Sequence, residues 1–278
     1  MKKKILVTGA SGYIGRDLLK RLLKEEYKLV VLVRDLGKMP AWLLGNQNLQ
    51  IVEGDLSNKK ALKKAVGKAD VVFHLAAALR MFEKNRELYQ TNVVGLKNLL
   101  SACKKANRKI RFIFASTIDV GKRETDYARS KIKGEEIIKK FCSGNSKIKY
   151  TIIRIGNIWG PGEEGMMGGV AKIMDKRNWQ GSILYHVLGN KLLYLIEMKN
   201  LVEKLVDLVK NPKATNKTLS LIDETLTAKD LVWRLKKQKL ISGYPKKLPF
   251  GGIIIKVWKF LGRIFKRGDL LVYLACEK

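Results

Sequence analysis

Short apolar runs alternate with stretches of helical periodicity over the first 156 residues. The runs KKILV, KLVVLVRD, VVFHLAA, IRFIFAS and KYTIIRI have the length and apolar content of buried strands. Residues between them, such as 84–107 and 124–141, have the spacing of helices. Strands that alternate with helices predict an α/β fold built on a doubly wound parallel sheet.

The regular alternation ends at about residue 156. A glycine-rich stretch follows (GNIWGPGEEGMMGG), and later segments predict a short strand (KTLSLID) and a helix (TAKDLVWRLKK). Thr227 and Asp230 have the spacing of a capping box at the start of that helix. We therefore expect a large domain over 1–156 and a smaller, partly interleaved substrate-binding lobe over 157–278.

The stretch LVTGASGYIG, near the start of the chain, lies between a predicted strand and a predicted helix. Gly9 permits a tight turn, Gly12 lets the backbone approach a pyrophosphate, and Gly15 lets the helix pack close to the strand. Tyr13 and Ile14 belong to the same turn, at the start of the helix. This context predicts a dinucleotide-binding, Rossmann-type fold. The apolar run before Thr8 is only three residues long (ILV), which argues against an export signal.

Composition narrows the remaining chemistry. The three cysteines are widely spaced and only His74 and His186 are present, so neither a disulfide framework nor a metal site is expected. No apolar run is long enough to span a bilayer, and a cytoplasmic protein is expected. The net charge of +31 is spread over the whole chain. It fits solvated helix faces, an anionic substrate, an anionic membrane or nucleic acid, and charge alone does not choose among them.

Tyr127 and Lys131 are four residues apart on a predicted helix, so both side chains project from one face. An ammonium beside a phenol lowers the phenol pKa, and such a tyrosine acts as a general acid or base near neutral pH. Thr117 ends a predicted strand and is placed to hydrogen-bond a substrate carbonyl or hydroxyl. These three residues are the predicted catalytic group.

Seven motifs in order resemble the extended short-chain dehydrogenase/reductase superfamily, in its NAD-dependent epimerase/dehydratase branch. They are TGASGYIG, GDL (54–56), HLAA (74–77), TNVVG (91–95), FAST (114–117), YARSK (127–131) and RIGNIWGPG (154–162). The resemblance implies an NAD(P)-dependent enzyme in which Tyr127 and Lys131 also contact the cofactor. It further implies cofactor contacts by the following residues: Asp55 at the adenine, Leu56, Leu75, Ala76, Ala77 and Asn92.

Arg34 follows the second predicted strand, where dinucleotide-binding folds choose between cofactors. An acidic residue there binds the ribose 2′-hydroxyl of NAD(H), whereas an arginine accommodates the 2′-phosphate of NADP(H). Arg34, with Lys38 nearby, favours NADP(H), while the adjacent Asp35 keeps NAD(H) open.

The substrate is less sharply indicated. Asn157 resembles the family's contact to a sugar-nucleotide diphosphate, which favours a nucleotide sugar as the small-molecule substrate. Ile118 and Asp119 follow Thr117 where sugar dehydratases have Asp-Glu, so a 4,6-dehydratase is disfavoured. Leu193 stands where relatives have a phosphate-binding arginine, with Lys191 as the available substitute.

Two alternatives therefore remain beside an oxidoreductase or epimerase of nucleotide sugars. One is an NADPH-dependent ketone reductase on a lipid-like substrate, similar to dihydroflavonol reductases and 3β-hydroxysteroid dehydrogenases. The other is a non-catalytic dinucleotide-binding protein at a membrane or on RNA, which the intact Tyr127–Lys131 pair disfavours.

Segment 246–267, near the C-terminus, is basic and amphipathic. Over 253–267, five cations lie opposite a broad apolar face, a pattern typical of helices at membrane surfaces and also of helices that cap a lobe. Peripheral contact with an anionic membrane is one expectation, and no nucleic-acid partner is expected. A homodimer through the helices at 84–107 and 124–141 is another expectation.

Overall fold

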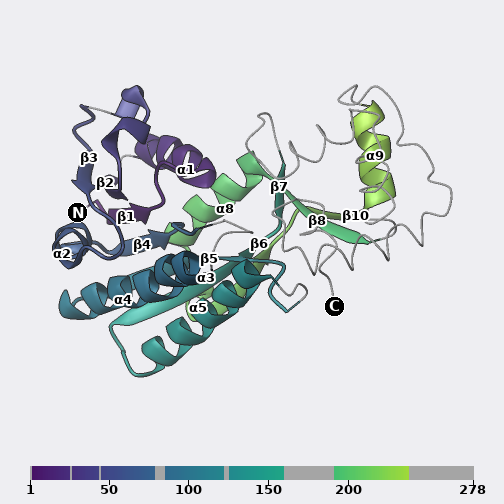
Figure 1. Ribbon diagram of the computed structural model, residues 1–278. Coiled ribbons are helices and arrows are strands. Elements are labelled where there is room, and N and C mark those ends of the chain that lie inside the picture. Colours follow the sequence, from purple (N-terminus) through teal and green to yellow (C-terminus); the bar gives the residue numbers. More distant parts are fainter. Residues whose placement is uncertain are drawn as a thin grey trace.

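A computed structural model describes residues 2–25, 27–43, 45–78, 85–121, 125–159 and 191–237 (Figure 1). The basic segment 246–267, His186 and most of the glycine-rich stretch lie outside the described residues. Within the described residues, no helix is long and apolar enough to cross a membrane. The same residues contain no cluster of three potential metal ligands, and Cys103 and Cys142 are free and buried.

The core of the molecule is a seven-stranded sheet in which every pairing is parallel. The strand order, β3-β2-β1-β4-β5-β6-β9, reverses direction beside β1, so the predicted doubly wound Rossmann fold is confirmed. The strands are β1 Lys4–Thr8, β2 Lys28–Val33, β3 Leu49–Glu53, β4 Val71–His74, β5 Ile110–Thr117, β6 Ile148–Ile155 and β9 Lys217–Leu221.

Helices cover both faces of this sheet because successive strand residues point to opposite sides. Ile5 and Val7 pack with α1 (Tyr13–Lys24) and α8 (Met198–Lys210) on one face. Leu6 packs on the other face, with three helices. These are α2 Lys59–Val66, α4 Gly95–Lys105 and α5 Asp126–Ser143.

One long predicted helix has an interrupted geometry. Residues expected to form a helix over 84–107 divide into α3 (Asn85–Tyr89), a π-helical turn (Gln90–Val94) and α4. The remaining short elements are 3-10 turns. They are Leu36–Lys38, Ala41–Leu43 and Pro212–Ala214.

A second sheet of three strands, ordered β10-β8-β7, lies beyond β6. It contains β7 Asn157–Trp159, β8 Leu192–Glu197 and β10 Glu224–Thr227, and α9 (Ala228–Lys237) follows it. The predicted capping box is present, since the Thr227 backbone N–H donates to Asp230 and the Asp230 N–H donates back to Thr227 Oγ1.

The segment KTLSLID corrects one expectation. It was expected in the smaller lobe, but its strand β9 pairs with β6 as the last strand of the large sheet. Leu219 and Leu221 pack into the same core as α1 and α8, which explains the placement. Residues after 157 therefore contribute α8 and β9 to the large sheet as well as strands to the small one.

Candidate functional site

The glycine turn connects β1 to α1 at the carboxyl edge of the large sheet. Gly9 has φ of +76°, and a Cβ there would lie 2.6 Å from the Ala76 nitrogen. A Cβ on Gly15 would lie 2.2 Å from the Gly9 carbonyl oxygen, so the helix contacts the turn directly. Gly9 and Gly15 are thus required by packing within the protein itself.

Gly12 differs from these two glycines. A Cβ there would meet only the Gly9 carbonyl oxygen, at 3.2 Å, so the space beside Gly12 is open on its other sides. Gly12 is also the N-cap of α1 and no side chain caps the helix there. An open glycine beside an uncapped helix N-terminus fits the pyrophosphate of a dinucleotide, which backbone N–H groups and the helix dipole would bind.

Arg34 and Asp35 follow β2 at the same edge. The Asp35 carboxylate accepts a hydrogen bond from the Gly37 N–H at 2.9 Å and caps the turn Leu36–Lys38. Arg34 is exposed and has no hydrogen bond or ion pair among the described residues. Asp35 therefore supports the loop, whereas Arg34 is available to a ligand.

Asp55 follows β3 and is anchored by one of its two carboxylate oxygens. Oδ1 accepts hydrogen bonds from the Ser57 N–H, the Ser57 hydroxyl and the Asn58 N–H. These bonds, the Ser57 hydroxyl first, lower the pKa of Asp55, to which the Arg34 charge also contributes. The carboxylate is ionised and fixed, and its Oδ2 has no partner among the described residues. The neighbouring Leu56 is buried.

Asn92 joins the loop after β4 to the helix that carries the predicted catalytic pair. Its amide is buried within the π-helical turn, accepts from the Ala78 N–H at 2.7 Å and donates to the Ala78 carbonyl. It also donates to Ser130 Oγ at 3.0 Å. Through the Ala78 contact it fixes Leu75, Ala76 and Ala77, which are partly buried beside the glycine turn. Asn92 thus positions these residues.

Thr117 ends β5 and hydrogen-bonds with a buried carboxylate. The Asp119 N–H donates to Thr117 Oγ1 at 3.2 Å, and Thr117 Oγ1 donates to Asp119 Oδ2 at 3.4 Å. Asp119 is only 6% exposed. Burial and then the Asp119 charge raise the pKa of Tyr127, so Asp119 acts on both Thr117 and Tyr127. Sequence reasoning considered Asp119 only as a departure from the dehydratase pattern.

Lys131 lies beneath Tyr127 on α5. Its Nζ is 5.5 Å from the Tyr127 ring centroid and donates to the Ala115 carbonyl of β5 at 2.7 Å. Burial lowers the pKa of Lys131 to about 7, although the Glu135 carboxylate opposes the change. Lys131 was expected to lower the pKa of Tyr127. Among the described residues the pKa of Tyr127 is raised instead, first by burial and then by the Asp119 charge.

A buried ion pair supports this helix one turn further along. Glu135, 3% exposed, accepts two hydrogen bonds from Arg154 of β6, at 3.0 and 2.7 Å, and a third from the Ser116 hydroxyl. These bonds connect α5 to both β5 and β6. Nothing in the sequence separated Glu135 from the exposed Glu136 on the same helix, because the partners of Glu135 come from other elements.

His74 is a core residue. It is buried, shares a 2.7 Å hydrogen bond with Thr8 and stacks on Phe114. Burial, followed by the Lys131 charge, lowers the pKa of His74 to about 3, so it is neutral.

Asn157, the predicted substrate contact besides Thr117, lies on the small sheet. Asn157, half-buried, begins β7 and pairs with Leu195 of β8. Leu193 is 3% exposed and therefore part of the core, while Lys191 precedes β8.

Most of the predicted site residues lie together at the carboxyl edge of the large sheet, where ligands bind in such folds. They are the glycine turn, Arg34, Asp55, Thr117, Tyr127 and Lys131.

A sequence model of the NAD dependent epimerase/dehydratase family matches residues 5–217. The chain belongs to this family. A UDP-N-acetyl-alpha-D-glucosaminuronate decarboxylase of Bacillus cytotoxicus is 33% identical over 208 residues, which are 66% of this chain and 64% of that protein. A dihydroflavonol 4-reductase of Arabidopsis thaliana is 36% identical over 124 residues, which are 42% of this chain and 32% of that one. Across three other curated relatives, the chain spans 49%, 33% and 52% of their length.

Solved structures agree on the fold. The UDP-glucose 4-epimerase of Thermotoga maritima with UDP-glucose has a TM-score of 0.71 at 21% identity, over 88% of this chain and 85% of that chain. The UDP-glucuronic acid 4-epimerase of Bacillus cereus in complex with NAD has a TM-score of 0.70 at 23% identity, over 88% and 87%. At these identities the likeness establishes the architecture alone.

Proposed function

We propose that this protein is an NAD(P)-dependent oxidoreductase or epimerase that acts on a nucleotide sugar, with Tyr127 as the proton-transferring group. The observation that carries the proposal is the Tyr127–Lys131 pair on α5, with Lys131 held to β5 through the Ala115 carbonyl. The pair lies at the carboxyl edge of the sheet, where the glycine turn also lies.

The dinucleotide, when bound, supplies a hydride acceptor or donor, and the protein manages the accompanying proton. Because its pKa is raised, Tyr127 is protonated at neutral pH and suited to donate a proton to a developing alkoxide. Lys131, whose pKa is about 7, supplies a positive charge near Tyr127 in its protonated form. Thr117 orients the substrate oxygen, and Asp119 holds the Thr117 hydroxyl in place.

NADP(H) is the proposed cofactor. Arg34 has no hydrogen bond or ion pair among the described residues and is therefore available to bind a 2′-phosphate. Asp35, the residue that would favour NAD(H), already uses its carboxylate to cap the turn that follows. The fixed Asp55 carboxylate, with Oδ2 unpartnered, is the proposed contact to the adenine.

The nucleotide-sugar assignment is supported by the likeness to a UDP-sugar decarboxylase and by Asn157, which the small sheet holds half-buried. A reductase of a lipid-like ketone is the second candidate. It is favoured by Leu193, a buried apolar residue at the position that resembles the phosphate-binding arginine of relatives. Likenesses to a 3-beta-hydroxysteroid dehydrogenase of Mycolicibacterium neoaurum and a 2-alkyl-3-oxoalkanoate reductase of Stenotrophomonas maltophilia support it as well.

The catalytic proposal is tested by Tyr127→Phe, with Tyr150→Phe on β6 as the matched control. We expect the first variant to lose activity by on the order of a hundredfold or more while it binds dinucleotide normally, and the control to keep full activity. Equal activity of Tyr127→Phe and the native protein would reject an acid–base role for Tyr127.

Calorimetry with UDP separates the two substrate classes. The protein is saturated with NADPH in one titration series and with NADH in another. Micromolar UDP binding would support a nucleotide-sugar enzyme, whereas tight NADPH binding without UDP binding would support the ketone reductase. The dinucleotide that binds more tightly tests the role of Arg34.

A further inference from the structure

The edge of the large sheet opposite the glycine turn is rich in lysine. In a doubly wound fold, strand starts and helix ends meet at that edge. Five of the seven strands begin at a lysine or directly after one, and all five helices on the sheet's faces have a lysine in the last turn. We call these twelve lysines the basic edge. They are Lys3, Lys28, Lys109, Lys147 and Lys217 at strands, and Lys24, Lys63, Lys64, Lys104, Lys105, Lys140 and Lys210 at helices.

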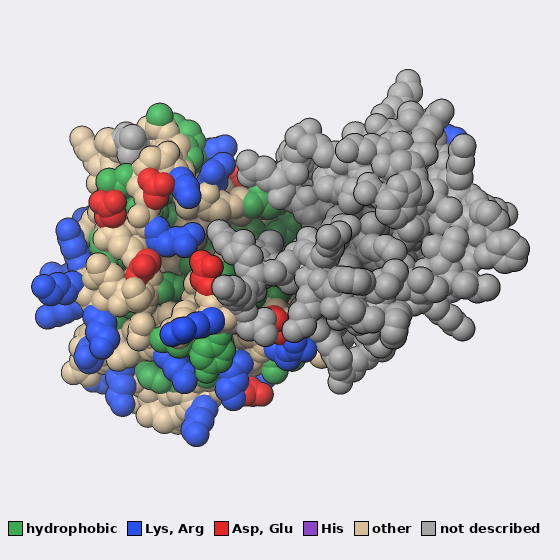
Figure 2. All heavy atoms as spheres, viewed as in Figure 1, with side chains coloured by type: hydrophobic (Ala, Val, Ile, Leu, Met, Phe, Trp, Pro, Cys, Tyr) green, Lys and Arg blue, Asp and Glu red, His purple; other side chains and the backbone are tan. Residues whose placement is uncertain are grey.

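Hydrogen bonds confirm that these chain ends lie side by side. The Lys3 Nζ donates to the Val209 carbonyl of α8, and Lys210 pairs with Glu25 at the end of α1. The Lys147 Nζ donates to Asn107, which follows α4. In Figure 2, lysine and arginine side chains line the left margin of the visible face, which includes α2 of Figure 1.

Acidic residues do not neutralise this edge. Its described acidic residues are Glu25, Asp70 and Asp207, and the first two are already paired with arginines or with Lys210. Nine of the twelve lysines have no hydrogen-bond or ion-pair partner among the described residues. Asp35 and Asp55 follow β2 and β3 and therefore lie at the opposite, carboxyl edge.

Stabilisation of helix ends does not account for so many lysines. Each helix carboxyl end carries roughly half a negative charge, so the five helices together offset only about two and a half positive charges. Like charges also face each other between neighbouring strands, as Lys4 and Lys28 do between β1 and β2, and Arg111 and Lys149 do between β5 and β6. Like charges placed directly opposite each other are destabilising.

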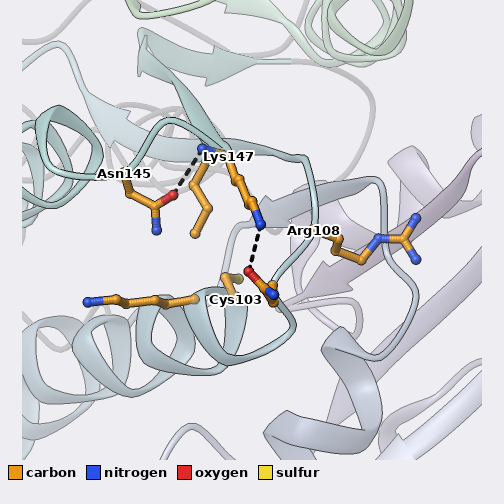
Figure 3. A pocket seen from close by; sticks show the side chains of 7 residues that line it. Cys103, Arg108, Asn145 and Lys147 are labelled. Carbon is orange, nitrogen blue, oxygen red and sulfur yellow. Dashed lines mark hydrogen bonds between the residues drawn. The ribbon is translucent and has the colours of Figure 1, made fainter.

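A cavity of about 160 Å³ opens within the basic edge (Figure 3). It lies between the end of α4 and the start of β6, and no acidic side chain lines it. Its lining residues are Cys103, Lys104, Asn107, Arg108, Asn145, Lys147 and Ile148. Two of its cationic side chains already have partners, since the Lys147 Nζ donates to Asn107 and Arg108 pairs with Asp70.

We propose that the basic edge docks the protein on the surface of an anionic lipid bilayer. A broad surface of unpaired lysines complements a plane of lipid phosphates, and each lysine near such a surface contributes to binding. Docking through this edge leaves the carboxyl edge, with Tyr127 and the glycine turn, facing away from the membrane.

Nucleic acid fits this edge less well. Single strands bind through aromatic side chains on which bases stack, and duplexes through an element that enters a groove. The exposed large apolar side chains of the described residues are Leu36, Trp42, Tyr89, Leu192 and Trp233, and none of them lies at a strand start or helix end of the basic edge.

The test uses the full chain and co-sedimentation with two kinds of vesicle, one of phosphatidylcholine alone and one with about 30% phosphatidylglycerol. The edge variant replaces Lys104, Lys105, Lys109 and Lys147 by Gln. The control variant replaces Lys59, Lys60, Lys97 and Lys199, which are exposed lysines away from this edge, by Gln as well. Each variant therefore loses four positive charges. NADPH binding and thermal unfolding verify that each variant is folded.

We expect the native protein and the control variant to bind the anionic vesicles at about 0.1 M salt and to be released at about 0.5 M. The edge variant should bind at least tenfold more weakly. Equal binding by the two variants would overturn the proposal, since attraction would then follow total charge or another segment. Failure of the native protein to bind anionic vesicles, with RNA binding that the edge variant loses, would assign the edge to nucleic acid.

Discussion

At the scale of single residues, Lys131 links the site to the stability of the fold. Its pKa is about 7 in the folded protein and 10.5 for an ordinary lysine, because burial penalises the charged form. Between these values the unfolded chain binds more protons than the folded one. Stability contributed by this site therefore increases as the pH rises from about 7 towards 10, by up to about 1.4 kcal/mol per unit.

Replacing Lys131 by Met should remove that dependence. As the pH is raised from 7 to 9, we expect the unfolding free energy of the native protein to increase relative to that of Lys131→Met. Urea unfolding at several pH values measures it, and the other lysines cancel because they are common to both proteins. Lys97→Met, at an exposed lysine of α4, is the control. A pH-independent difference would show that Lys131 titrates as an ordinary lysine.

Arg34 determines cofactor choice if the proposed NADP(H) preference is correct. Arg34→Ala should weaken NADPH binding by about tenfold or more, because a charge-assisted hydrogen bond to the 2′-phosphate is lost, and should leave NADH binding nearly unchanged. Fluorescence titration of both dinucleotides measures the ratio. Arg86→Ala, at an exposed arginine of α3, is the control. Equal weakening of both dinucleotides would mean that Arg34 contacts something other than the 2′-phosphate.

At the scale of elements, the glycine turn separates the requirements of folding from those of binding. Gly15→Ala places a methyl group against backbone and should destabilise the protein by about 3 kcal/mol or more. Gly12→Ala meets one atom at 3.2 Å and should change stability by less than about 1 kcal/mol, yet obstruct the pyrophosphate. Thermal unfolding and dinucleotide titration of both variants measure these effects. Normal dinucleotide affinity in Gly12→Ala would contradict the assigned turn.

The glycine turn, most strands of the large sheet and the capping box at Thr227 were predictable because their signals are local and need only neighbouring residues. Strand β9 was misplaced because the segment KTLSLID does not encode its partner, and only its pairing with β6 in the structure places it in the large sheet. Glu135 and Asp119 were missed for the same reason, since burial by other elements gives each its role.

At the scale of the whole molecule, the positive charge is concentrated at the basic edge rather than spread evenly. The sequence showed a net charge of +31 spread over the chain, which suggested solvated helix faces. The topology gathers the lysines that precede strands and end helices at one edge, although they are far apart in sequence. A property that looks uniform along the chain thus becomes polarised in space, and only the strand order reveals it.

This arrangement predicts how stability responds to salt. Unpaired lysines crowded at one edge repel each other in the folded state, and salt screens that repulsion over about 10 Å at 0.1 M. We expect the melting temperature to rise by about 3 °C when sodium chloride is increased from about 0.02 to 0.3 M. The edge variant should gain less than the control variant, although both lose four charges, because repulsion depends on how closely charges lie. An equal rise in melting temperature for both variants would mean that total charge alone sets the repulsion. A fall in the melting temperature of the native protein would mean that ion pairs such as Glu135–Arg154 outweigh the repulsion.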